Sequence, residues 1–319
     1  MWLTGAVQPR SIAVGTLSVV RMRFLLILLA LPLLATFAPA GMIESPAYPS
    51  RPTIWAEPVP LRTDTPAARR LGRLIFLGGW WLRGNHPDLG GISAMHVAEG
   101  TVTAINDNGV VLRFGVPTRA GPAPLHALEL PGAPGATKKQ RDSEALVIRG
   151  DRAWISFERA NAIYRYRLPE WRQEASARPP AIAKWPLNSG GEAMVRLRDG
   201  RFLLFSEERR RPDGSTEAVL FDGDPAEPGT EAAVLGYRAP DGYRITDAAE
   251  LADGRLLVLN RRVSLMNGIT ARLTIATKPQ LFAGAVLTGT EVAAFAPPVT
   301  TDNYEALSVA WWVMVLLAS

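Results

Sequence analysis

The feature that most constrains the fold of this chain is a repeated unit of short apolar runs separated by turn residues. The unit is clearest over residues 141–168, where Glu144 opens an apolar run and a Gly150–Asp151 pair separates it from the next. A third run, residues 162–168, alternates apolar and polar side chains. Short runs of this kind, bounded by turn chemistry, are typical of strands in an antiparallel meander.

The unit recurs along the chain with a polar residue near the start of each copy. Aligning the copies places one such residue per unit in register, Asp247 with a one-residue slip: Ser93, Glu144, Glu192, Asp247 and Glu305. The intervals between them are 51, 48, 55 and 58 residues. A period of about 50 residues with three or four strands per unit predicts propeller blades. We therefore expect an all-β fold, a β-propeller of about five to six blades.

Two other architectures fit the sequence less well. The chain has no convincing amphipathic run with a period of 3.6 residues, which disfavours α/β folds. A β-sandwich would not repeat its carboxylates in one phase.

The last unit stops early. After Val309 the chain reads AWWVMVLLAS and ends. A blade needs about 40 residues, so we expect a truncated last blade, an aberrant apolar tail over 310–319, and an incomplete or loosely closed ring. The alternative is a natural terminal strand that closes the ring with residues 71–82.

The first 60 residues predict export and a connecting segment. Arg21 and Arg23 precede an apolar stretch over 24–40 that ends in Ala-Pro-Ala, an arrangement typical of a signal peptide. Met22 is the expected start, and 1–40 is the expected N-terminal extension and signal peptide. The stretch is shorter than the roughly 20 residues of a spanning helix, so we expect a periplasmic or secreted protein without a membrane anchor. Residues 41–60 are Pro-rich and predict a linker, which leaves 61–309 for the propeller.

Composition narrows the function classes. The chain has no cysteine, which excludes a thiolate nucleophile and a zinc–thiolate site. The formal net charge is +5, but without residues 1–40 the chain keeps 32 basic and 30 acidic residues, a net charge of +2. Nucleic-acid binding is therefore not expected.

The recurring acidic position suggests a metal site. The first strand of each propeller blade lines the central channel, so one acid per blade gathers carboxylates around one axis. The candidate ligands are Glu144, Glu192, Asp247, Glu305 and Asp107. Crowded carboxylates repel each other, and Ca²⁺, which takes six to eight oxygen ligands, would relieve that repulsion. The alternative is structural, with each carboxylate accepting backbone N–H bonds or pairing with an arginine.

Charged residues also follow equivalent second strands and are expected to share one rim of the channel. The arginines among them are the candidate substrate-binding residues: Arg159, Arg261 and Arg262. A guanidinium group holds anions through two parallel hydrogen bonds. The alternative is a set of rim salt bridges, each contributing about 0–1 kcal/mol.

Several segments in the right order are similar to one known family. DSEALVI, GGEAMVRLRDGRFLLFSEE, DAAELADGRLLVLNRR and DNYEALSV resemble the phytase-like family, also called the esterase-like activity of phytase family. The resemblance covers residues from about Leu71 to Val309 and implies an exported bacterial β-propeller. It also implies hydrolysis of phosphate or carboxyl esters, by analogy with propeller phytases that use calcium and acidic residues. The chain departs from the family pattern after Val309.

Together these observations predict a metal-dependent hydrolase of phosphate esters or related esters. Glu144 and Glu192 are the candidate catalytic residues, and the expected partner is a small anionic ester bound by a monomer. One alternative is a non-catalytic propeller that binds a ligand or a protein. A second alternative is a lactonase-like metal propeller.

Overall fold

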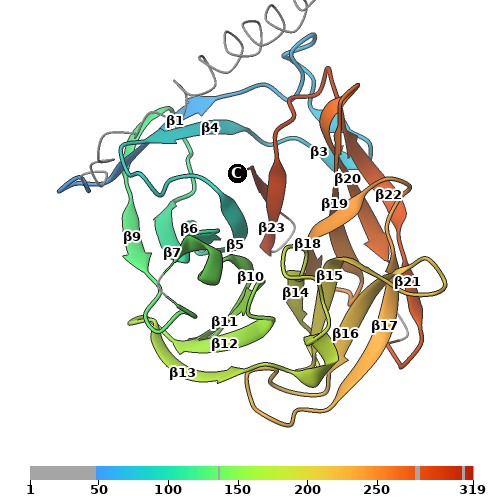
Figure 1. The fold of residues 1–319 in the computed structure, drawn as a ribbon. Coiled ribbons are helices and arrows are strands. Elements are labelled where there is room, and N and C mark those ends of the chain that lie inside the picture. Colours follow the sequence, from blue (N-terminus) through green and yellow to red (C-terminus); the bar gives the residue numbers. More distant parts are fainter. Residues whose placement is uncertain (1–47, 136, 277–280, 311–312, 319) are drawn as a thin grey trace, which may run out of the picture. The chain divides into compact units, whose positions relative to one another are not determined.

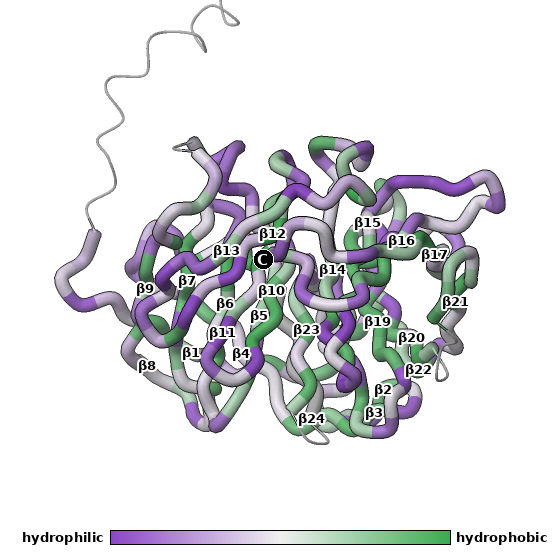
Figure 2. The backbone as a smooth tube through the Cα atoms, turned by 90° about the horizontal axis from the view of Figure 1, so that it is seen from below, coloured by the Kyte–Doolittle hydropathy of each residue, from purple (hydrophilic) through white to green (hydrophobic). Residues whose placement is uncertain are grey.

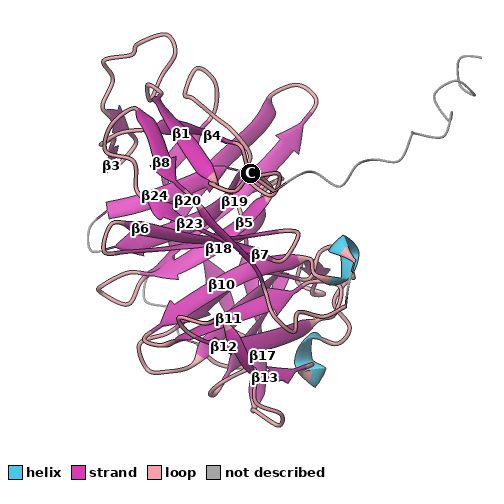
Figure 3. Ribbon diagram, turned by 90° about the vertical axis from the view of Figure 1, so that its left-hand side faces the viewer, coloured by secondary structure: helices cyan, strands magenta, loops and turns pink. Residues whose placement is uncertain are grey.

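Antiparallel sheets arranged around a central axis form the fold, as seen in the computed structural model (Figure 1). The structure describes residues 48–135, 137–276, 281–310 and 313–318. The predicted signal peptide, with Met22, lies outside these residues. Strands make up nearly all the regular structure of the described residues, and two short 3-10 helices, η1 (Lys138–Gln140) and η2 (Pro180–Ile182), join them (Figure 3).

Five sheets form the blades. Blade one contains β5 (Ile92–Ala98), β6 (Thr101–Asn106), β7 (Val110–Gly115) and β9 (His126–Glu129). Blade two contains β10 (Ser143–Arg149), β11 (Arg152–Phe157), β12 (Ala162–Arg167) and β13 (Arg172–Ala177). Blade three contains β14 (Gly191–Arg196), β15 (Phe202–Arg210), β16 (Thr216–Phe221), β17 (Ala232–Arg238) and, parallel to β17, β21 (Val286–Thr288). Blade four contains β18 (Arg244–Glu250), β19 (Leu256–Ser264), β20 (Gly268–Ala276) and β22 (Thr290–Phe295), and blade five contains β23 (Tyr304–Ala310) and β24 (Val313–Ala318).

The first strands of the five blades form the inner ring. Each of β5, β10, β14 and β18 contacts the next in chain order, and β23 contacts both β18 and β5 (Figure 1). The architecture is therefore a five-bladed β-propeller, which confirms the predicted fold class. The fifth blade has two described strands, β23 and β24.

The turn chemistry of the repeat explains the strand boundaries. β10 and β11 pair from Arg149 with Arg152 onwards, so Gly150 and Asp151 make a two-residue hairpin turn. Gly150 has a φ of 60°, a left-handed conformation that glycine adopts without steric cost. The three strands predicted over residues 141–168 are β10, β11 and β12.

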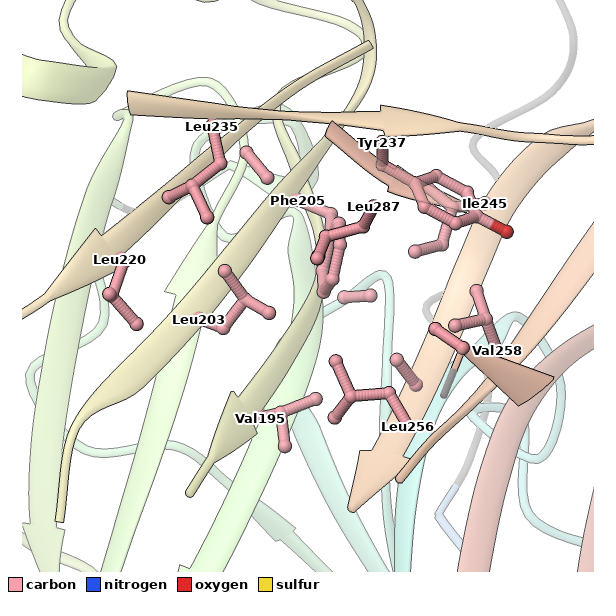
Figure 4. Close-up of a cluster of buried hydrophobic side chains, with 14 of the residues drawn as sticks. Val195, Leu203, Phe205, Leu220, Leu235, Tyr237, Ile245, Leu256, Val258 and Leu287 are labelled. Atoms are coloured by element: carbon pink, nitrogen blue, oxygen red, sulfur yellow. The ribbon is translucent and has the colours of Figure 1, made fainter. Parts of the chain in front are cut away.

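The hydrophobic core lies between neighbouring sheets. Between blades three and four, Phe205 and Leu203 pack with Tyr237, Ile245 and Val258 (Figure 4). Figure 2 shows hydrophobic residues concentrated in the strands and hydrophilic residues largely in the connecting loops. Packing sheet against sheet in this way fixes each blade relative to its neighbours and holds the inner strands in place.

Buried polar contacts close the ring at blade five. The Val97 backbone N–H of β5 donates to Ser308 Oγ of β23 at 2.9 Å. On the other side of β23, the Leu307 backbone N–H donates to Asp247 Oδ2 of β18 at 2.7 Å. The prediction of an incomplete or loosely closed ring is therefore wrong, because β23 is joined to both neighbours.

Replacing the closing hydroxyl should weaken the fold. Ser308→Ala leaves the buried Val97 N–H without its acceptor, and we expect the free energy of unfolding to fall by about 1–2 kcal/mol. Denaturant unfolding measures this change. An unchanged midpoint would show that the contact contributes nothing to ring closure.

A further three-stranded sheet and a small hairpin precede or flank the blades. The sheet contains β4 (Trp80–Gly84), β1 (Thr53–Pro58) and β8 (Gly121–Pro124), and the hairpin contains β2 (Arg70–Leu71) and β3 (Leu74–Ile75). β1 falls within the predicted linker 41–60, so that prediction is wrong for residues 53–58. Their buried side chains, such as Ile54, pack into the core of blade one and make a strand favourable. Likewise the predicted tail 310–319 contains β24, which pairs with β23.

Candidate functional site

Every inner strand has a β-bulge at the same place near its start. The register between the first and second strand shifts by one residue there in all five blades. The residues left out of the pairing are Ser93, Glu144, Glu192, Thr246 and Glu305. A bulge leaves its extra residue unpaired and re-aims the side chain. The acidic residue that recurs in the sequence is therefore a bulge residue in blades two, three and five.

Asp247 does not share this position, because Thr246 is the bulge residue of blade four. The Asp247 carboxylate is buried and accepts the backbone N–H of Ala248 at 2.8 Å and that of Leu307 at 2.7 Å. Burial raises the pKa of Asp247 well above its usual value. Both oxygens accept backbone N–H groups, and one of them cross-links β18 to β23, so these contacts give Asp247 a structural role. Its role as a metal ligand stays a prediction.

A second repeated position lies on the second strand side of each bulge. It is the residue directly after the one that pairs with the first strand just before the bulge. Its residues in blades one to four are Asp107, Glu158, Glu207 and Arg261. The first three donate backbone N–H groups to Gly91 O at 2.8 Å, Asp142 O at 2.9 Å and Gly190 O at 3.1 Å. Arg261 lies opposite Arg244 in the antiparallel pairing of β18 and β19. Each partner lies two residues before a bulge residue. The strand-end charges and the bulge residues therefore belong to one rim of the channel.

Three carboxylates of blade two converge at this rim. Oxygens of Asp142, Glu144 and Glu158 all lie within 4.8 Å of one another. The carboxyl groups of Asp142 and Glu144 share a hydrogen bond, and Glu158 Oε1 accepts the Gly190 N–H at 3.2 Å. The sequence analysis did not select Asp142. Its place two residues before a bulge residue was the available signal.

The crowding of these carboxyl groups raises their pKa values. Burial raises the pKa of Glu144 well above its usual value, and the charges of Asp142 and Glu158 raise it further. Burial and then the Asp142 charge raise the pKa of Glu158 to about 7, against the opposing hydrogen bond from Gly190. Desolvation and like charge both disfavour the ionised form. The group therefore favours either bound protons or a bound cation.

Glu192 extends the cluster into blade three. Burial raises the pKa of Glu192 well above its usual value, the charges of Glu144 and Glu207 raise it further, and Arg261 opposes them. Within the described ranges, no lysine or arginine lies at ion-pair distance from Glu144, Glu158 or Glu192. The structural alternative had each carboxylate pair with an arginine or accept backbone N–H bonds. Arginine pairing does not describe these three residues, whereas Glu158 does accept a backbone N–H, from Gly190.

Asp107 and Arg159 lie beside the cluster. Asp107 forms an ion pair with Lys138 Nζ at 2.9 Å. Burial raises the pKa of Asp142, and the Asp107 charge adds to that rise. Arg159 Nε is 3.8 Å from Asp142 Oδ2, buried, and without a hydrogen-bond partner. The predicted ligand Asp107 is therefore already paired with a lysine. The Arg159 guanidinium group lies beside the cluster, and its Nε makes no hydrogen bond.

Arg261 and Glu305 belong to an ion-pair network. Arg261 pairs with Glu305 and donates to Asn303 Oδ1 at 2.7 Å, and its Nη2 lies 3.8 Å from Glu207 Oε1. Asn303 also donates to Glu305 at 2.9 Å. Arg261 therefore binds carboxylates of the protein, so a role in holding an anionic substrate does not suit it.

Arg262 lies on the other face of β19. Its guanidinium carbon is 4.8 Å from the centre of the Tyr243 ring, a distance typical of a cation–π contact. Successive side chains of a strand point to opposite faces, and Arg262 packs against Tyr243 whereas Arg261 contacts Glu305 and Glu207. Substrate binding by Arg262 stays a prediction that this contact does not favour.

The donor set of the cluster suits a hard divalent cation. Asp142, Glu144 and Glu158 supply carboxylate oxygens, which are the ligands that Ca²⁺ prefers, and they converge within 4.8 Å. Among the described residues no cationic side chain pairs with Glu144 or Glu158, and Asp142 has Arg159 at 3.8 Å. The residues present therefore fit a calcium ion, with Glu192 beside them.

Among the described residues, no helix has the length and apolar character needed to cross a bilayer.

A comparison with curated proteins returned no match. Solved structures that align with the chain include glutaminyl cyclase of Myxococcus xanthus, at 11% identity and a TM-score of 0.39, over 69% of this chain and 81% of that one. The computationally designed Ika4 protein aligns at 11% identity and a TM-score of 0.31, over 57% of this chain and 91% of that one. Scores this low carry no argument about function.

One family comparison covers most of the chain. The model of the phytase-like family, described as esterase-like activity of phytase, matches residues 87–312. The match spans all five inner strands, from β5 to β23, and so includes both repeated rim positions. The chain belongs to the phytase-like family, whose description is esterase-like activity of phytase.

Proposed function

We propose that this propeller hydrolyses phosphate esters or related esters at the carboxylate cluster of Asp142, Glu144, Glu158 and Glu192, with Ca²⁺ as its cation. Membership of the phytase-like family supports a hydrolase-type propeller. The observation that carries the proposal is the convergence of three carboxylates within 4.8 Å, with no cationic side chain among the described residues paired to Glu144 or Glu158. A scaffold gains nothing from such uncompensated charge.

Asp142, Glu144 and Glu158 would hold the cation. A bound Ca²⁺ would supply positive charge that neutralises the cluster and polarises an ester oxygen. Without that charge the acidic rim would repel an anionic ester, so cation binding and substrate binding are expected to depend on each other.

Two residues of the chain have roles toward the substrate in this proposal. Arg159 would hold the anionic group, because its guanidinium group lies at the rim and is engaged only by Asp142 at 3.8 Å among the described residues. Glu192 would transfer the proton to the leaving oxygen. Burial raises the pKa of Glu192 well above its usual value, which is the direction that favours the protonated form a general acid requires.

The direct test is hydrolysis of a panel of phosphate monoesters and carboxyl esters in calcium, with Glu192→Gln as the paired variant. The proposal expects turnover by the wild type and a loss of about 10²–10⁴-fold in Glu192→Gln, the range for removal of a general acid. Turnover that is equal in both proteins would remove Glu192 from the mechanism. A calcium-loaded protein without turnover of any ester would contradict the hydrolase proposal.

Arg159→Ala should weaken substrate binding. A charge-assisted hydrogen bond contributes about 1.5–3 kcal/mol, so we expect KM to rise about 10- to 100-fold, with a smaller change in kcat. Arg262→Ala is the matched control, because Arg262 is next to the same rim in sequence but stacks on Tyr243. Equal KM values for Arg159→Ala and the control would contradict the role of Arg159.

A non-catalytic propeller that binds a ligand or protein is the second candidate. It is favoured by the rim carboxylates that are already paired, namely Glu207, Glu208 and Glu305 with Arg244 and Arg261. This candidate predicts ligand binding without turnover, and the ester panel separates it from the hydrolase.

We also propose that the protein is exported. The basis is the Arg21, Arg23 and apolar 24–40 pattern of the sequence, which is typical of a signal peptide. Expression of the full chain with fractionation tests this: a periplasmic protein that begins near residue 41 is expected. A protein that keeps residues 22–40 in its exported form would contradict the cleavage.

A further inference from the structure

Arg261 connects three blades at the channel rim. It belongs to blade four, and its guanidinium group pairs with Glu305 of blade five and lies 3.8 Å from Glu207 of blade three. It also donates to Asn303 at 2.7 Å. The Arg261 side chain is 18% exposed, so it is enclosed by these acidic partners rather than extended into solvent.

Arg261 has a positive charge at a repeat position that is acidic in other blades. The equivalent residues of blades one, two and three are all acidic: Asp107, Glu158 and Glu207. Among the four described blades with this position, blade four is the one with a cation there. Asp107 and Glu158 lie on the side of the rim that holds Asp142 and Glu144, whereas Arg261 stands among the carboxylates of blades three and five.

The rim is thereby divided into two halves with different charge balance. In the half formed by blade two, Glu144 and Glu158 have no ion-pair partner among the described residues. In the half formed by blades three to five, Arg261 pairs with Glu305 and Glu207. Arg244 neutralises the more exposed Glu208 at the outer edge of the same half.

We propose that Arg261 occupies the position of a second divalent cation and thereby limits the rim to one Ca²⁺, at Asp142, Glu144 and Glu158. Glu207 and Glu305 supply carboxylate oxygens like those of the blade-two cluster, and the guanidinium group provides the positive charge that an ion would otherwise provide. The choice of a single calcium at this rim rests on the function proposed above, but the blocking role of Arg261 does not.

Arg261→Gln tests this role, because it removes the charge and keeps a side chain of similar polarity. The number of bound Ca²⁺ ions per chain is measured by equilibrium dialysis, together with thermal melting in calcium and in chelator. The proposal expects one Ca²⁺ in the wild type and two in Arg261→Gln. It also expects calcium to raise the melting temperature more in the variant than in the wild type, because Glu207 and Glu305 lose their internal cation.

Three further variants keep the test decisive. Arg262→Gln is the matched control and should bind one Ca²⁺, because Arg262 faces Tyr243. Arg261→Lys keeps the charge and should also bind one. Arg261→Gln combined with Glu207→Gln should return to one, since the second site loses a ligand. If Arg261→Gln does not fold in chelator, its folding in calcium with two ions bound gives the same answer.

The outcomes separate this inference from the proposed function. Equal numbers of bound Ca²⁺ in the wild type and Arg261→Gln would overturn the role of Arg261, whether that number is one or zero. A wild type that binds none, with a variant that binds one, would support the role of Arg261 while contradicting the calcium site of the proposed hydrolase.

Discussion

A Glu144→Gln variant is expected to lose ester hydrolysis by about 10²–10³-fold, the effect of removing one electrostatic group from an active site, while it stays folded. Glu144 is the bulge residue of blade two, and its carboxyl group lies within 4.8 Å of those of Asp142 and Glu158. An amide has nearly the same shape but neither neutralises a cation nor repels the neighbouring carboxylates.

The same variant should therefore be at least as stable as the wild type in chelator, and more stable at pH 8. The measurement is the initial rate of ester hydrolysis together with thermal melting in chelator. Glu170→Gln, at an exposed turn residue, is the matched control and should leave both unchanged. A Glu144→Gln protein that melts lower than the wild type in chelator would show that the carboxylate stabilises the fold, which is the structural alternative.

The second large effect is a loss of stability as the pH rises without a bound cation. The pKa of Glu158 is raised from 4.5 to about 7, so the folded state binds more protons than the unfolded state between these values. Its stabilising contribution is complete below about pH 4.5 and is lost as the pH rises through about 7. A shift of this size corresponds to at most about 3 kcal/mol, which solvent screening reduces, and the raised pKa values of Glu144 and Glu192 act in the same direction.

Thermal melting at several pH values between 5 and 8, in chelator, measures this effect. For a chain of this size about 1 kcal/mol corresponds to roughly 2–4 °C, so we expect the melting temperature to fall by several degrees. The carboxylates with lowered pKa values, such as Asp199 and Asp253, act only below about pH 4 and do not affect this range. Glu158→Gln should reduce the slope. A melting temperature that rises from pH 5 to pH 8 would show that the raised carboxylate pKa values do not control the pH dependence of stability.

The sequence predicted the propeller because the repeat appears in local features. Turn glycines such as Gly150 reflect backbone conformation, and short apolar runs reflect burial. The same series of runs and turns recurs in successive blades. The recurrence of Glu144, Glu192 and Glu305 also identified the bulge position correctly, because a bulge is a backbone feature at a constant distance from the strand start.

The partners of the rim residues were less predictable. Whether a carboxylate meets an amide, an arginine or another carboxylate depends on contacts between blades, which lie about 50 residues or more apart in the chain. Asp247 differs from a bulge residue by one position, and that shift turns its side chain towards the Leu307 N–H of the next blade. Arg261 and Arg262 are adjacent in sequence, yet strand alternation places only Arg261 at the rim. Asp142 was missed because it lies before the strand, outside the apolar run that marks the repeat.

The measurement that tests the central claim most directly is thermal melting of the wild type at pH 8 with calcium and with chelator. A ligand that binds only the folded state stabilises it by about 2.7 kcal/mol at one hundred times its dissociation constant. If Asp142, Glu144 and Glu158 hold a cation, calcium should raise the melting temperature by several degrees, and chelator should reverse the rise. A protein that melts cooperatively at the same temperature in both solutions would contradict the calcium site.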